Sequence, residues 1–99
     1  MYVIFLRFSP KRVQAAQWLA GHRQWLQQGL DDGIFLAAGS LEDGKGGAIV
    51  ATSVEQGALT ARIEQDPFVV HGIVTPEVHA IAPSLVSPGF AELLSGAKP

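Results

Sequence analysis

The first run in which apolar residues predominate spans residues 2–8, Tyr-Val-Ile-Phe-Leu-Arg-Phe. The run is too short for a stable helix and is rich in aromatic and β-branched residues, which predicts a strand. Alternate positions are apolar on both sides, with Arg7 at the end of one of them. A sheet covered on one side only would alternate more cleanly, so both faces of this strand are expected to be covered.

A long helix is predicted next. Ser9-Pro10 is typical of a helix start, and residues 11–31 contain no proline before Asp31-Asp32-Gly33 closes the run. At about 100° per residue, apolar side chains fall in one arc and most glutamines face away. The arc consists of Ala15, Leu19, Leu26 and Leu30, and Trp18, His22 and Trp25 lie along its flank. His22 is therefore expected to face the interior.

The remaining elements follow in the order strand, strand, helix, strand, at residues 34–39, 48–52, 53–66 and 72–82. Ser53 and Gln56 have capping-box spacing and predict the start of the second helix, which Asp66-Pro67 is expected to end. Pro76 lies inside the last strand and is tolerated best at a sheet edge. A short helix is predicted in the tail, at residues 90–94.

This element order predicts an α+β fold, a ferredoxin-like βαββαβ sandwich with an antiparallel sheet. We expect one domain over residues 1–99, with its core in residues 2–82 and a C-terminal tail in residues 83–99. In this architecture both helices cover the same sheet face. The other face is then expected to meet a second copy of the chain, which gives a homodimer.

Composition excludes several classes of function. The chain of 99 residues is 47% hydrophobic and 16% charged, with a net charge of −2 and scattered basic residues, so no nucleic-acid partner is expected. No apolar run approaches the roughly 20 residues that span a bilayer, so no membrane partner is expected and a cytoplasmic location is the default. Without cysteine, and with three histidines that lack ligand-like spacing, neither a metal nor another cofactor is expected.

The segment Asp66-Pro67-Phe68 is the strongest indication of a functional group. Proline disfavours the α conformation in the residue before it, so the preceding helix should stop there, where an acid opposes the negative end of the helix dipole. Such a carboxylate needs a cationic or hydrogen-bonding partner from another helix. His22 is the candidate.

These residues resemble the YCII-related family of small dimeric α+β barrel proteins. The resemblance extends from the Tyr2 strand to about Ala82 and rests on His22, residues 32–39, and Asp66-Pro67-Phe68 followed by Gly72. It implies that His22 and Asp66 form a buried pair in an active site that binds a small molecule. The sequence departs from the family pattern after Gly39, where Ser40 replaces a common proline, and before His22, where the frequent basic residue has no counterpart.

A carboxylate paired with an imidazole can fix the imidazole tautomer and stabilise the imidazolium, which is general acid–base chemistry. Elimination, isomerisation or hydrolysis of a small molecule fits this chemistry. Covalent acyl transfer does not, because the chain has no cysteine and no Gly-x-Ser-x-Gly elbow. Two alternatives stay open: the pair only ties the helices together, or the chain is a non-catalytic metabolite-binding or accessory module.

Four further residues are candidates for substrate contact, each with a simpler structural interpretation. Ser40 follows the second strand but is also a common turn residue, and Trp18 could wall a pocket or belong to the core. Arg7 could meet a carboxylate of the substrate or of a partner copy, or extend into solvent. Phe68 belongs to the Asp-Pro-Phe segment itself. Outside this set, His71 is expected in an exposed loop, and Glu77 and His79 on one face of the last strand.

Overall fold

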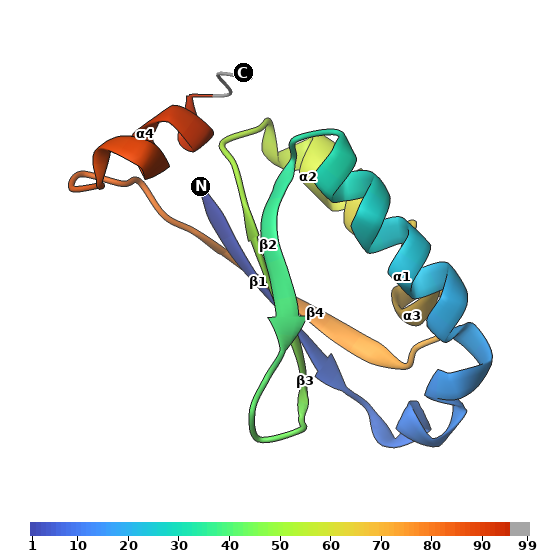
Figure 1. Ribbon diagram of the computed structural model, residues 1–99. Coiled ribbons are helices and arrows are strands. Elements are labelled where there is room, and N and C mark those ends of the chain that lie inside the picture. Colours follow the sequence, from blue (N-terminus) through green and yellow to red (C-terminus); the bar gives the residue numbers. More distant parts are fainter. Residues whose placement is uncertain (96–99) are drawn as a thin grey trace.

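A four-stranded antiparallel sheet forms the centre of the computed structural model, which describes residues 1–95 (Figure 1). The strands β1 (Tyr2–Phe8), β2 (Phe35–Ser40), β3 (Gly46–Ala51) and β4 (Val74–Ala80) lie in the order β2-β3-β1-β4. The predicted ferredoxin-like α+β fold is therefore confirmed. Pro76 lies on the edge strand β4, where its missing N–H disrupts the sheet least.

The helices are η1 (Pro10–Gln14, a 3₁₀ helix), α1 (Ala15–Asp31), α2 (Gln56–Ile63), α3 (Pro67–Val70) and α4 (Pro88–Leu94). Figure 1 shows α1, α2 and α3 on the same face of the sheet. The first predicted helix is thus divided, because its initial turn is the 3₁₀ helix η1, which Ser9 caps by accepting a hydrogen bond from the Lys11 N–H. No helix among residues 1–95 is long and apolar enough to cross a bilayer.

The predicted cap of the second helix is wrong. Ser53 accepts a hydrogen bond from the amino group of Met1 at 3.0 Å and does not cap α2. The carboxylate of Glu55 takes that role, accepting from the N–H groups of Gly57 and Ala58, both at 2.9 Å. The helix consequently begins at Gln56, three residues later than the serine suggested.

The interpretation of Asp66 as a helix stop is also wrong. Helix α2 already ends at Ile63, and Asp66 is the N-cap of α3, with its carboxylate accepting from the Phe68 N–H at 3.0 Å. Pro67 occupies the first turn of α3, where its missing N–H costs nothing. The acid therefore lies at the favourable, positive end of a helical turn.

The core lies between the sheet and the three helices. Its fully buried members include Ile4, Phe35, Ile49, Leu59 and Ile73. Gly29 of α1 lies directly on Phe35, since a Cβ added there would be 2.1 Å from a ring carbon. On the opposite sheet face Val3, Phe5 and Val50 are half-buried. Figure 1 shows α1, α2 and α3 on the other face of the sheet.

Beyond β4 the chain leads away from the core to α4, which lies past one end of the sheet on the side of the N-terminus (Figure 1). The Thr52 hydroxyl donates to the Leu94 carbonyl oxygen at 3.2 Å and ties this helix back. The short tail helix is confirmed, but it begins at Pro88, two residues before its predicted start. Residues 96–99 of the predicted domain lie outside the described residues.

Candidate functional site

His22 and Asp66 form a hydrogen-bonded pair. His22 lies in the middle of α1 and Asp66 at the start of α3, and the His22 Nδ1 to Asp66 Oδ1 distance is 2.8 Å. The side chain of Asp66 is completely buried, whereas that of His22 is 13% exposed. Gly21 allows the approach of the two helices, since a Cβ there would lie 3.1 Å from the Pro67 ring. The structure therefore brings together His22, which the helical arc indicated, and Asp66, which the following proline indicated.

The hydrogen bonds of Asp66 fix the orientation of the imidazole. Oδ1 accepts from the Phe68 N–H and also lies within hydrogen-bond distance of His22 Nδ1. Because an ionised carboxylate can only accept, its bond to His22 requires the proton to be on Nδ1. The Phe68 ring lies flat on the imidazole, with centroids 4.0 Å apart and planes inclined by 7°. These contacts leave Nε2 as the nitrogen that is free to react.

Behind the pair, Asp66 Oδ2 is buried without a hydrogen-bond partner among the described residues. An unsatisfied buried carboxylate oxygen costs free energy, and such costs concentrate at functional sites.

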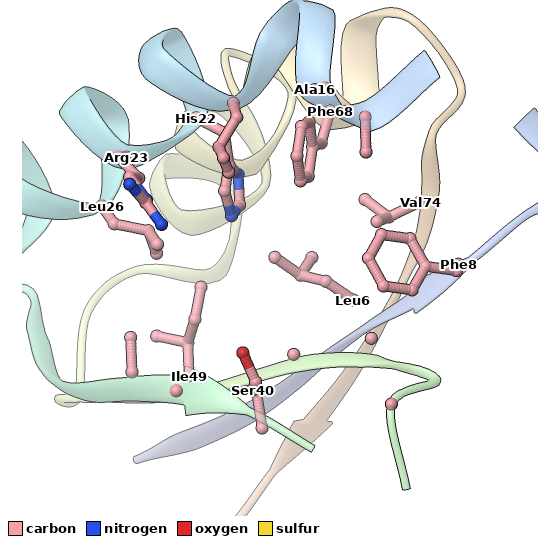
Figure 2. Close-up of a pocket in the computed structure, with 18 residues that line it drawn as sticks. Leu6, Phe8, Ala16, His22, Arg23, Leu26, Ser40, Ile49, Phe68 and Val74 are labelled. Atoms are coloured by element: carbon pink, nitrogen blue, oxygen red, sulfur yellow. The ribbon is translucent and has the colours of Figure 1, made fainter. Parts of the chain in front are cut away.

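A cavity of about 480 Å³ lies between α1 and the sheet, and His22 forms part of its wall (Figure 2). Most of the wall is apolar, and its large side chains include Leu6, Phe8, Leu19, Leu26, Ile49 and Phe68. Among residues 1–95, the side chains in the wall that carry hydrogen-bonding groups are those of His22, Arg23 and Ser40. In Figure 2 the outer end of the imidazole points into this cavity and the Ser40 hydroxyl approaches it from the sheet.

Two of the four residues predicted to contact substrate lie in the cavity wall, and two do not. Ser40 and Phe68 line the cavity, whereas Arg7 and Trp18 do not. Arg7 lies on the open sheet face, 3.3 Å from Glu77 and with its guanidinium 4.9 Å from the centre of the Phe5 ring. Trp18 stacks on His71, with ring centroids 3.5 Å apart. The half-buried His71 is thus not the exposed loop residue expected from the sequence.

Arg23 is the cavity residue that the sequence analysis missed. It follows His22 directly on α1, on the border between the apolar arc and the polar side of the helix. Sequence alone could have shown only this adjacency, because whether the side chain reaches the cavity depends on where the sheet lies under α1.

A separate charged group lies on the open sheet face. The Glu77 carboxylate accepts a hydrogen bond from His79 at 2.9 Å and one from Arg7 at 3.3 Å. Both hydrogen bonds, that of His79 first, lower the pKa of Glu77 from its ordinary value. Among residues 1–95 no group of three or more His, Cys, Asp or Glu side chains is arranged to hold a metal ion.

Comparison with known proteins gives a family and a structural neighbour. The family described as "YCII-related domain" matches residues 1–79. No curated protein matches the chain. Among solved structures, the 5-chloro-2-hydroxyhydroquinone dehydrochlorinase TftG from Burkholderia phenoliruptrix AC1100, in complex with 2,5-dihydroxybenzoquinone, is similar with a TM-score of 0.70 and 15% sequence identity. The alignment covers 82% of this chain and 92% of that chain, which shows a shared fold.

Proposed function

The chain belongs to the YCII-related family, and on that premise we propose that it is an enzyme that transfers protons on a small organic molecule. His22 is the general acid or base, and Asp66 is the carboxylate that orients it. The observation that carries the proposal is the asymmetry of the imidazole: Nδ1 is held by a buried carboxylate at 2.8 Å, while the other end of the ring faces an apolar cavity.

This arrangement suits proton transfer for three physical reasons. The bond to Asp66 selects the tautomer in which Nε2 carries the lone pair, and it stabilises the imidazolium that forms when Nε2 takes a proton. The Phe68 ring prevents the imidazole from turning out of position. The mostly apolar wall offers few hydrogen-bonding side chains that could compete with the substrate for the proton.

Within general acid–base chemistry, elimination is the reaction we propose first. The structural neighbour is named as a dehydrochlorinase, and dehydrochlorination is an elimination. In such a step Nε2 would take a proton from one carbon, the C–H electrons would form a double bond, and the leaving group would depart from the next carbon as an anion. Isomerisation and hydrolysis use the same nitrogen.

The test compares turnover by matched variants. Chloride release from 5-chloro-2-hydroxyhydroquinone is measured first, followed by deuterium incorporation from D₂O into a panel of small carboxylates and enols. His22→Ala and Asp66→Asn are expected to lower kcat by roughly 10²- to 10⁴-fold, as loss of a general base or its orienting carboxylate does elsewhere. His71→Ala removes a histidine that stacks on Trp18 outside the cavity, and it should retain native turnover.

Native turnover in both folded site variants would refute the catalytic role. Binding of small molecules without turnover of any compound would instead favour the alternative, a non-catalytic metabolite-binding module that uses the same cavity.

We also propose that two copies pair through the open sheet face. Val3, Phe5 and Val50 are apolar there, and cross-strand neighbours such as Val3 and Val50 share that face. A chain of 10.5 kDa should then sediment at twice that mass, and Phe5→Arg should shift it toward the monomer. Sedimentation of the native protein at the monomer mass would contradict the pairing.

A further inference from the structure

Arg23 differs from the other arginines of the described chain in having no partner. Arg7 pairs with Glu77, Arg12 donates to the Gly44 carbonyl oxygen at 3.2 Å, and Arg62 pairs with Asp32 at 2.9 Å. Arg23 makes no hydrogen bond and no ion pair with any residue among 1–95. It nevertheless belongs to the cavity wall, beside His22 (Figure 2).

The charged side chain in the described cavity wall is the positive one of Arg23. Within the described part of the chain, no aspartate or glutamate side chain lines the cavity. The carboxylate of Asp66, which bonds to the cavity residue His22, is completely buried and already accepts two hydrogen bonds. The cavity therefore has a guanidinium at its wall, and none of the described residues in that wall is acidic.

We infer that the molecule held in this cavity is an organic anion, and that Arg23 binds its charged oxygens. A guanidinium presents parallel N–H groups that match a planar carboxylate or a pair of ring oxygens, and such charge-assisted hydrogen bonds are among the strongest in proteins. The apolar body of the anion would lie against the aliphatic and aromatic wall. A volume of about 480 Å³ is within the usual range for small-molecule sites and accommodates one substituted ring.

The positions of the other polar groups define how the anion lies. Ser40 approaches from the sheet, across the cavity from α1, and its hydroxyl makes no hydrogen bond within the described chain. It is the second donor available to the ligand. An anion bound to Arg23 would place its adjacent carbon atoms beside His22, the preceding residue of the helix. The inference rests on the proposed function and adds a substrate class to its reaction class.

Two probes of the same shape and different charge test the inference, namely benzoate and the neutral benzamide. Titrations followed by amide chemical shifts give both the affinity and the location, with Leu26 and Gly47 as reporters in the cavity wall. The native protein should bind benzoate at least about tenfold more tightly than benzamide, the difference expected for one charge-assisted contact. Arg23→Gln should remove this preference, and Arg23→Lys should retain part of it.

Arg62→Gln is the matched control, because it removes the same charge at the contact with Asp32, outside the cavity wall. It should leave both affinities within twofold of native. The inference is overturned if the native protein does not prefer benzoate, or if Arg23→Gln keeps the preference in a folded protein. Because these titrations require no turnover, they can succeed where the catalytic proposal fails, and the reverse is also true.

Discussion

Replacing Asp66 with alanine should destabilise the protein far more than removing an ordinary helix cap. The carboxylate has two roles in the structure, since it caps α3 through the Phe68 N–H and holds His22 at 2.8 Å, while fully buried. Loss of a cap costs about 1 kcal/mol. Loss of a buried hydrogen bond to a charged group costs about 1.5–3 kcal/mol more, so Asp66→Ala should lower the free energy of unfolding by about 2.5–4 kcal/mol.

Glu55→Ala provides the matched control. Glu55 also caps a helix through two backbone N–H groups at 2.9 Å, but it is exposed and has no histidine partner. Its removal should cost only about 1 kcal/mol. The difference between the two variants in the free energy of unfolding then isolates the contribution of the buried pair, about 1.5–3 kcal/mol.

The assay is equilibrium urea unfolding followed by the fluorescence of the two tryptophans, of which Trp25 is buried in the core. All variants are compared at one protein concentration, because self-association would make the apparent stability depend on concentration. If Asp66→Ala does not fold, Asp66→Asn replaces it, with an expected cost of about 1–3 kcal/mol for the buried amide that gains no acceptor. An equal loss in the free energy of unfolding for Asp66→Ala and Glu55→Ala would refute the reasoning.

Gly29→Ala should destabilise the protein by about 1–3 kcal/mol despite the better helix propensity of alanine, because its Cβ would lie 2.1 Å from the ring of the buried Phe35. Gly21→Ala, on the same helix, would place its Cβ 3.1 Å from the Pro67 ring and should lower the free energy of unfolding less in the same urea assay. Equal losses of stability in the two variants would contradict the clash at Phe35. Glu77 should titrate below its ordinary range in an NMR pH series, because the His79 and Arg7 hydrogen bonds lower its pKa. Its stabilising contribution should therefore persist at neutral pH and fade as the pH falls through that lowered pKa, and a titration midpoint that does not rise in His79→Ala would show that His79 is not the main cause.

The sequence predicts the sheet and the orientation of α1 well, because both depend on strong local patterns. The apolar alternation of residues 2–8 identifies the central strand β1, and Pro76 identifies the edge strand β4. The helical arc turns His22 inward without reference to any other element. These features are decided within single segments, which is why a single sequence suffices for them.

The errors concern residues whose role depends on a neighbour. Pro67 can end one helix or begin the next, and the short turn that separates α2 from α3 decides between these roles for Asp66. The Ser53 hydroxyl bonds to the chain terminus rather than to α2, a contact across 52 positions of sequence.

Cavity membership is the least predictable feature, since it requires the relative placement of helices and sheet. A helical projection gives the direction of Trp18 but not the position of α3, which brings His71 against it. For Arg23 the projection suggests only a border position, and the sheet beneath α1 makes it part of the wall.

Chemical rescue tests the central claim most directly, namely that His22 itself moves a proton in the cavity. His22→Ala leaves a space of imidazole size between the Phe68 ring and the cavity, next to the Asp66 carboxylate. With any compound that the native protein turns over, this variant should show the strongly lowered kcat expected above and should regain turnover in proportion to added imidazole. Native turnover by His22→Ala without imidazole would contradict the account.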